Sequence, residues 1–244
     1  MKIIVCKNYE EMSKKAAMVV KDVIGRYYRP KLGLATGSSP EGLYKELVKM
    51  YESNDINFLN AETVNLDEYV GIDPENPQSY HYYMQKNFFD KINIRKENIH
   101  IPSGSEDKLD EAVRDYNEKL DYVGRRDIQI LGIGENGHIA FNEPAFKLNL
   151  RTSIVELTED TVKANSRFFE NEEDVPKRAI SMGIKDILNA EVILILASGA
   201  KKQKAVKELI EGDRLDTKFP ASMLHIHNNV VLVIDEDAYG LVGK

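Results

Sequence analysis

The stretch Leu131–Pro144, LGIGENGHIAFNEP, has the form of a buried strand that runs into a glycine-rich turn. The turn contains three glycines, Gly132, Gly134 and Gly137. Glycine lets a backbone approach a ligand closely, and the turn then presents His138, which titrates near neutral pH, and Glu143. This pattern favours an active site. A glycine-rich turn in which the histidine merely caps the loop would have the same sequence. The neighbouring segments must therefore distinguish the two interpretations.

Strand-like and helix-like segments alternate on both sides of this stretch. Apolar runs predict strands at Lys2–Cys6, Leu32–Ala35, Thr63–Leu66, Asp127–Ile133, Ser153–Leu157, Val192–Ala197 and Asn229–Ile234. Periodic or capped segments predict helices at Tyr9–Tyr28, Pro40–Tyr51, Ser79–Phe89, Leu109–Val123, Glu159–Asn165 and Lys201–Glu211. This order is typical of an α/β fold, doubly wound and Rossmann-like, with a mostly parallel sheet and helices on both faces. We expect residues 1–244 to form a single domain.

The composition excludes several classes of protein. The chain has 244 residues, of which 42% are hydrophobic and 30% charged, and a formal net charge of -7. Such an acidic balance lacks the basic face of a general nucleic-acid binder. The single cysteine, Cys6, excludes an internal disulfide and a cysteine-based zinc site, and its apolar run predicts a buried side chain. No apolar run reaches the ~18 residues of a membrane helix, and no signal peptide is evident, so we expect a cytoplasmic protein.

In a doubly wound sheet, ligands bind at the carboxyl ends of the strands. The strand Leu32–Ala35 ends in a small hydroxyl-rich loop, and a helix is predicted to start at Pro40. The loop residues are Thr36, Gly37, Ser38 and Ser39. A helix N-terminus offers free N–H groups and a partial positive charge, which suits a phosphate monoester. The P-loop and dinucleotide patterns are absent, and a plain helix cap fits the same letters equally well.

A second strand end carries paired acids in Val64–Gly71, VNLDEYVG. Asp67 or Glu68 there suits a general base or a metal ligand, and a solvated turn is the alternative. Two cations follow other segments: Arg167 in ANSRFF and Lys202 in SGAKK, and isolated surface cations are common. Together, a phosphate cradle, a carboxylate base and a His–Glu pair fit proton transfer on a phosphorylated small molecule, without a metal or cofactor.

These segments resemble one enzyme family over most of the chain. TGSSP, NLDEYVG, GENGHIAFNEP, ANSRFF and SGAKK occur in the order seen in glucosamine-6-phosphate deaminases, from about Leu32 to Asp235. The resemblance implies conversion of D-glucosamine 6-phosphate and water to D-fructose 6-phosphate and ammonia, a step of amino sugar metabolism and N-acetylglucosamine catabolism. The pyranose ring opens, a base moves a proton from carbon 2 to carbon 1, and the imine at carbon 2 is hydrolysed.

The resemblance also implies residue roles. His138 would be the acid–base for ring opening, Glu143 the group that positions it, and Asp67 the base for the carbon 2 proton. The phosphate contacts would be Thr36, Gly37, Ser38, Ser39, Arg167 and Lys202. Asn136 is a departure, because many members carry aspartate there; asparagine can hold the histidine by a hydrogen bond but brings no charge. No cofactor or metal is implied, and the substrate is the expected partner of a monomer or small homo-oligomer that binds neither nucleic acid nor membrane.

Two alternative functions share parts of this pattern. A 6-phosphogluconolactonase would share the phosphate loop and the histidine turn but has no need of NLDEYVG or FNEP. A sugar-phosphate sensor domain would be expected to lose Asp67, His138 and Glu143, all of which are present. Two further sets are expected to be structural. His225 and His227 alternate as in a strand, and Tyr80, Tyr82 and Tyr83 form an aromatic helix that packs over the pocket.

Overall fold

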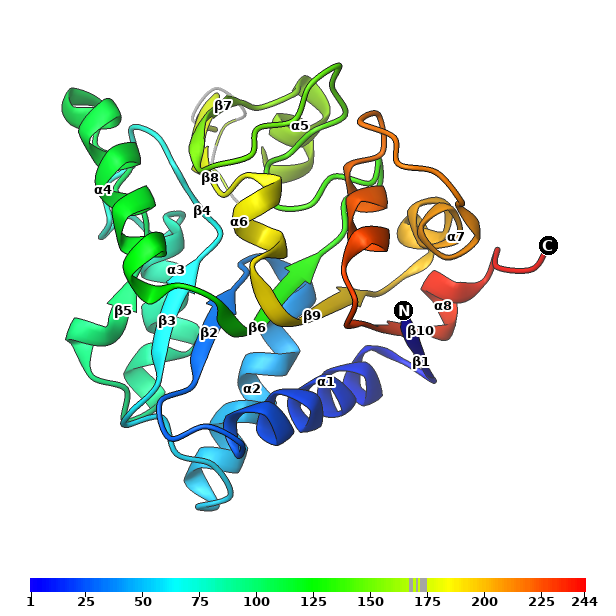
Figure 1. Ribbon diagram of the computed structural model, residues 1–244, viewed down its shortest axis with the longest axis horizontal. Coiled ribbons are helices and arrows are strands. Elements are labelled where there is room, and N and C mark those ends of the chain that lie inside the picture. Colours follow the sequence, from blue (N-terminus) through cyan, green and yellow to red (C-terminus); the bar gives the residue numbers. More distant parts are fainter. Residues whose placement is uncertain (167–168, 170, 172–174) are drawn as a thin grey trace.

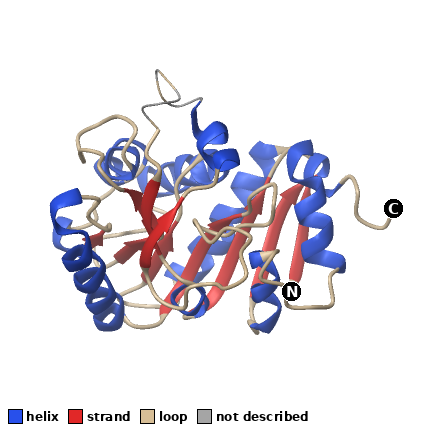
Figure 2. Ribbon diagram, turned by 90° about the horizontal axis from the view of Figure 1, so that it is seen from above, coloured by secondary structure: helices blue, strands red, loops and turns tan. Residues whose placement is uncertain are grey.

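The computed structural model describes residues 1–166, 169, 171 and 175–244. Within these residues, seven parallel strands form one sheet, and helices lie on both of its faces (Figure 2). The strand order is β1 (Lys2–Cys6), β10 (Val230–Asp235), β9 (Ala190–Ala197), β6 (Arg126–Gly132), β2 (Lys31–Leu34), β3 (Glu62–Asn65) and β5 (Ile99–His100). The predicted doubly wound α/β fold is confirmed.

The direction of winding reverses in the middle of this sheet. From β2 the chain proceeds outward to β3 and β5, whereas from β6 it proceeds the other way to β9 and β10. The reversal lies between β2 and β6, which are direct neighbours with Leu32 opposite Ile128. A reversal of this kind opens a crevice at the carboxyl ends of the two strands. The loop after β2 and the glycine turn after β6 therefore start side by side.

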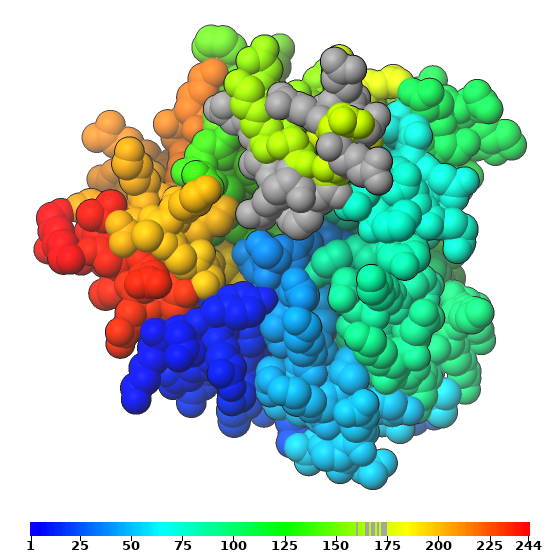
Figure 3. Space-filling view, turned by 180° about the vertical axis from the view of Figure 1, so that it is seen from behind, coloured from blue at the N-terminus to red at the C-terminus, as the bar shows by residue number. Residues whose placement is uncertain are grey.

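The predicted helices are present in the described residues, with changes of a few residues at their ends: α1 (Tyr9–Ile24), α2 (Ser38–Glu52), α3 (Tyr80–Asn87), α4 (Leu109–Val123), α5 (Glu159–Ser166) and α7 (Gln203–Glu211). The short helices α6 (Ile184–Leu188) and α8 (Glu236–Tyr239) were not predicted. Asn8 caps α1 by accepting a hydrogen bond from the Glu11 N–H. In Figures 1 and 3, α1 and α2 pack against each other, and they contact strands of the same sheet.

A small antiparallel sheet was not predicted, although a strand was predicted at Ser153–Leu157, where one of its three strands lies. Its strands are β4 (Asp67–Tyr69), β8 (Arg178–Ser181) and β7 (Ser153–Glu156), with β8 in the middle. Only Leu66 separates β3 from β4. The Leu66 N–H donates to the Leu34 carbonyl oxygen at the end of β2, and the Leu66 carbonyl accepts from the Met182 N–H. The strand predicted at Thr63–Leu66 thus passes directly from the large sheet into the small one.

One continuous hydrophobic core joins the strands of the large sheet to the helices packed against it. Residues 193–197 of β9 and 232–234 of β10 are fully buried, and Cys6 is buried as predicted. A second cluster joins Tyr69, Phe141 and Ala179 against the small sheet. None of the helices in the described part of the chain combines the length and apolar character needed to cross a membrane.

The strand alternation predicted for His225 and His227 is wrong. His225 lies in a 3-10 helix, Pro220–Ile226, and His227 follows its end. Pro220 occupies the start of this helix, where a proline loses no hydrogen bond. The His227 Nε2 lies 3.0 Å from the Ala190 carbonyl oxygen, which gives that ring a structural contact at the start of β9.

Candidate active site

The glycines of the turn after β6 allow His138 to lie against the backbone. The Gly134 N–H donates to the His138 carbonyl oxygen at 2.9 Å. A Cβ at Gly134 would lie only 2.4 Å from the imidazole ring. Gly137 has φ of +83°, and a Cβ there would lie 2.1 Å from the ring of Phe219. Both positions therefore require glycine, and the orientation of the imidazole depends on them.

The Glu143 carboxylate contacts the imidazole. Its Oε1 lies 3.3 Å from His138 Nδ1. It also accepts hydrogen bonds from Asn136 Nδ2, at 2.8 Å, and from Thr161 Oγ1, at 2.5 Å. Burial raises the pKa of Glu143, but His138 and these donors outweigh burial and hold the pKa below its ordinary value. Glu143 is therefore ionised at neutral pH, and its negative charge lies beside His138 Nδ1.

Asn136 acts on the glutamate and on the backbone of the turn, not on the imidazole itself. Its Oδ1 accepts a hydrogen bond from the His138 backbone N–H at 3.1 Å, while its amide group donates to Glu143. The predicted hydrogen bond to the histidine is thus made to the main chain. Thr161, on α5, was not predicted. Its only sequence signal is the pair Thr158 and Thr161, whose hydroxyls hydrogen-bond at the start of the helix.

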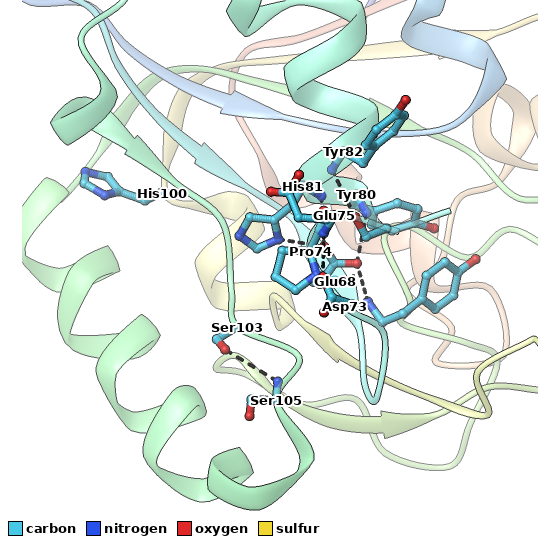
Figure 4. A network of polar contacts seen from close by, with 12 residues as sticks. Glu68, Asp73, Pro74, Glu75, Tyr80, His81, Tyr82, His100, Ser103 and Ser105 are labelled. Carbon is cyan, nitrogen blue, oxygen red and sulfur yellow. Dashed lines mark hydrogen bonds and ion pairs between the residues drawn. The ribbon is translucent and has the colours of Figure 1, made fainter. Parts of the chain in front are cut away.

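The two neighbouring acids of β4 have different surroundings. Asp67 is buried, and burial together with the negative charge of Glu68 raises the pKa of Asp67 to about 8. The Glu68 carboxylate accepts backbone hydrogen bonds from Tyr69, at 2.8 Å, Tyr80, at 3.0 Å, and His81, at 2.9 Å, and lies 2.8 Å from His81 Nδ1 (Figure 4). Glu68 therefore holds the N-terminus of α3, whereas Asp67 makes none of these contacts.

Two side chains tie the small sheet to the histidine turn. Ser181 stands opposite Asp67 in the β4–β8 ladder, and its Oγ accepts from the Phe141 N–H at 3.1 Å. Asn142 donates to the carbonyl oxygens of Ile139, at 3.0 Å, and Met182, at 2.8 Å. These contacts hold the strand of Asp67 and the loop of His138 at the same edge of the molecule. Phe141 and Asn142 of the FNEP segment therefore have a structural role, which was not predicted from the sequence.

The hydroxyl-rich loop after β2 has free space beside its backbone at Gly37. Gly37 precedes α2 with φ of +95°, no side chain caps this helix, and a Cβ at Gly37 would meet nothing within 4 Å. The plain helix-cap alternative therefore has no capping side chain to support it. The predicted aromatic helix, α3, lies against this loop: the Tyr83 hydroxyl donates to the Gly37 carbonyl oxygen at 2.7 Å.

The loop after β9 resembles the loop after β2, because it also has a glycine with positive φ just before a helix. Gly199 has φ of +87°, and a Cβ there would meet nothing within 4 Å. The buried Asp235 carboxylate accepts from the Gly199 N–H at 3.0 Å and hydrogen-bonds with the Ser198 hydroxyl. Lys202 ends the short helix Ala200–Lys202 that follows, at the carboxyl end of β9, the neighbour of β6. Asp235 was not predicted. Arg167 lies outside the described residues.

The described ranges contain no convergence of three or more His, Cys, Asp or Glu side chains that would hold a metal ion. The groups with acid–base character at the strand ends are Asp67 from β4 and the His138–Glu143 pair from the turn after β6. A buried carboxyl with a pKa near neutrality and an imidazole backed by a carboxylate can move protons on a bound molecule.

Comparison with known proteins identifies the family. The family model for glucosamine-6-phosphate isomerases and 6-phosphogluconolactonases matches residues 7–233. A glucosamine-6-phosphate deaminase of Thermoanaerobacter sp. (strain X514) is 52% identical over 242 residues, covering 99% of this chain and 95% of the relative. The chain belongs to the glucosamine-6-phosphate deaminase family. The resemblance seen in the sequence is therefore confirmed.

Solved structures separate the deaminase family from the lactonase alternative. A monomeric glucosamine-6-phosphate deaminase superposes with a TM-score of 0.96 at 44% identity, covering 99% of this chain and all (100%) of the other. A 6-phosphogluconolactonase from Trypanosoma brucei has a TM-score of 0.75 at 16% identity, covering 98% and 97% of the two chains. At that identity the lactonase shows the fold alone. The function of the deaminase family is the one supported for this chain.

Replacing Gly134 with alanine is expected to lower kcat roughly tenfold to a hundredfold while the fold persists, because the new methyl group would displace the imidazole. Steady-state kinetics and a thermal melt followed by circular dichroism would measure both effects. Gly25→Ala is the matched control, since its Cβ would come no closer than 3.4 Å to other atoms. Equal kcat values in the two variants would contradict the positioning of His138 by Gly134.

Proposed function

We propose that this chain converts D-glucosamine 6-phosphate and water to D-fructose 6-phosphate and ammonia, with Asp67, His138 and Glu143 as its proton-handling residues. The choice of reaction rests on the similarity to deaminases, one of which is 52% identical to this chain over 242 residues. The roles of the residues rest on the burial of Asp67 and on the His138–Glu143 contact. The whole chain acts as one domain in this proposal.

Ring opening is assigned to His138. The imidazole takes the proton of the anomeric hydroxyl and returns a proton to the ring oxygen, so that the open-chain aldehyde forms without net gain or loss of protons. Protonation of the His138 imidazole creates a positive charge on a ring whose Nδ1 lies 3.3 Å from Glu143 Oε1, and the ionised carboxylate stabilises this charge. Asn136 and Thr161 keep that carboxylate in place.

Proton transfer between carbons is assigned to Asp67. Its carboxylate takes the proton from carbon 2 of the open-chain sugar, which gives an enolamine, and delivers it to carbon 1. The resulting imine at carbon 2 adds water and releases ammonia. The pKa of Asp67, about 8 in the free protein, suits a group that must both accept and return a proton near neutral pH. The ammonium group of the bound substrate would favour the ionised carboxylate.

The phosphate group is assigned to the loops that follow β2 and β9. Gly37 and Gly199 expose backbone without a side chain, and the hydroxyls of Thr36, Ser38 and Ser39 lie beside the start of α2. Lys202 supplies a cation from the second loop, and Arg167 is kept in this role from the family pattern. The protein is proposed to be cytoplasmic, a monomer or small homo-oligomer, with no nucleic-acid or membrane partner.

The test incubates purified protein with glucosamine 6-phosphate and measures ammonia and fructose 6-phosphate in the same sample. Equal amounts of the two products, unchanged by a chelator, are expected. A parallel sample with 6-phosphogluconolactone should show no hydrolysis above the uncatalysed rate. Lactone hydrolysis without ammonia release from the amino sugar would replace the proposed function by that of a lactonase.

A further inference from the structure

Asp235 is a buried carboxylate at the carboxyl end of β10, the strand next to β9 in the large sheet. In Figure 1, β10 leads directly into α8 near the C-terminus. The proposed function gives this side chain no role. Burial of a charged carboxylate costs free energy unless hydrogen-bond donors surround it. The donors around Asp235 therefore indicate what the side chain holds in place.

The Asp235 carboxylate joins two segments of the chain. Its Oδ1 accepts from the Ala238 N–H at 2.8 Å, which caps the N-terminus of α8. The same oxygen accepts from the Gly199 N–H at 3.0 Å. The other oxygen, Oδ2, accepts from the Ser198 hydroxyl. One side chain therefore ties the loop after β9 to the start of α8.

These hydrogen bonds bear on the form of the loop. Gly199 has φ of +87°, and a Cβ there would meet nothing within 4 Å. Crowding therefore does not impose this conformation, and the hydrogen bonds of Gly199 must hold it. Its N–H donates to Asp235, and its carbonyl oxygen accepts from the Lys202 N–H at 3.0 Å. The backbone from Ser198 to Lys202 is thus held by contacts that begin at Asp235.

The support beneath the loop is itself fixed, because α8 packs against the start of α7. Gln203 Nε2 donates to the Asp237 carbonyl oxygen at 2.7 Å. A Cβ at Gly240 would lie 2.6 Å from the same amide nitrogen, so the two segments are in close contact. α8 also contacts the short helix Ala200–Lys202. Asp235 therefore connects the loop to a firmly packed part of the fold.

We propose that Asp235 is a positioning residue for phosphate binding, which holds the loop from Ser198 to Lys202 in the conformation that receives the phosphate group of the substrate. This proposal rests on the proposed function, which assigns the phosphate to this loop and to the loop after β2. A loop that is already ordered loses less conformational entropy when a ligand binds. The carboxylate also repels a phosphate dianion. Ordering outweighs this repulsion, because three donors already balance much of the carboxylate charge.

The variant Asp235→Asn tests this role. Asparagine keeps the shape of the side chain, but its amide nitrogen cannot accept a hydrogen bond, so at least one of the three donors loses its acceptor. Phosphate contacts act equally on substrate and transition state, so loss of loop order should raise KM and leave kcat nearly unchanged. We expect KM for glucosamine 6-phosphate to rise roughly tenfold, with kcat within about twofold of the parent. Isothermal titration calorimetry with inorganic phosphate should show the same rise in Kd.

Two further variants separate positioning from a general loss of stability. Ser198→Ala removes one donor but leaves α8 capped, and it should raise KM and the phosphate Kd roughly threefold. Asp237→Asn is the matched control, since it makes the same change of charge on α8, and the contact of Asp237 with Gln203 uses only the backbone carbonyl. We expect parental values for this control. Melts followed by circular dichroism check that each variant is folded at the assay temperature, and Ser198→Ala decides alone where Asp235→Asn is not.

Three results would overturn this proposal. The first is tighter binding of phosphate by Asp235→Asn than by the parent, which would show that repulsion outweighs ordering. The second is a fall in kcat without a rise in KM, which would place the effect of Asp235 on the chemical steps. The third is a set of constants that does not distinguish Asp235→Asn and Ser198→Ala from Asp237→Asn. Calorimetry needs no turnover, so a parent protein that binds phosphate but releases no ammonia would count against the proposed function alone.

Discussion

Replacement of Asp67 by asparagine is expected to abolish most of the turnover of glucosamine 6-phosphate and, at the same time, to make the protein more stable. Asparagine has nearly the same shape but cannot accept the proton of carbon 2, so kcat should fall by roughly 10²–10⁴-fold. Coupled assays of ammonia and fructose 6-phosphate would measure the loss. In the parent protein, kcat/KM should rise with pH through about 8, as Asp67 loses its proton.

The gain in stability follows from the raised pKa of Asp67. The folded protein holds the Asp67 proton up to about pH 8, whereas the unfolded chain loses it near the ordinary value of 3.8. The unfolded state therefore binds fewer protons between these values, and the Asp67 contribution to stability decreases as the pH rises. At pH 8 the variant should therefore melt at a clearly higher temperature than the parent.

The pH dependence of this gain separates ionisation from packing. Thermal melts of the parent and of Asp67→Asn should nearly coincide at pH 4 and diverge progressively toward pH 8. Glu68→Gln serves as the comparison, because its carboxylate accepts backbone hydrogen bonds at the start of α3 and its loss should destabilise. A difference in Tm between parent and Asp67→Asn that is independent of pH would show that the buried charge is not its cause.

Replacement of Glu143 by glutamine is expected to lower kcat/KM by roughly 10²-fold, with a specific effect on ring opening. The glutamine keeps the size of the side chain but removes the negative charge beside His138 Nδ1. Protonated His138 would then lose its partner, and the exchange of protons at the ring oxygen would slow. Thr161→Val removes only one donor to the carboxylate and should cost about tenfold.

A substrate with deuterium at carbon 2 distinguishes the two steps. If ring opening limits the rate in Glu143→Gln, the isotope effect on kcat/KM should fall towards one, because breakage of the C–H bond at carbon 2 is no longer rate-limiting. Thr161→Val should show an intermediate value. An isotope effect in Glu143→Gln that equals or exceeds that of the parent would contradict the assignment of the His138–Glu143 pair to ring opening.

Local sequence patterns predicted the large sheet well. The strand Lys2–Cys6 and the helix Leu109–Val123 have the predicted bounds, since each has strong periodicity and clear ends. The small sheet was missed because its strands are short and pair across long separations: β4 at Asp67 bonds with β8 at Ser181. Such pairing leaves no local signal, and the short β8, Arg178–Ser181, has no distinct pattern of its own.

The residues of the candidate site divide in the same way. His138, Glu143 and Asn136 could be proposed from the sequence because they lie within one turn, and the contacts that the structure shows among them are local. Thr161 and Asp235 were missed because each acts on a loop far away in the sequence. The pair Asp67 and Glu68 was found as a pair, but only the contacts of Glu68 with α3 distinguish the two roles.

The single residue between β3 and β4 restricts how this enzyme can vary. Successive side chains of a strand point to opposite faces, so insertion or deletion of one residue between Glu62 and Asp67 would exchange the faces of Asp67 and Glu68. Glu68 would then take the position of Asp67, the proposed base, and the aspartate would be left at the start of α3. Length changes must therefore fall outside this segment, for example in the exposed loop 71–77. A nine-base insertion there should be tolerated, whereas a three-base insertion at Leu66 should be inactivating.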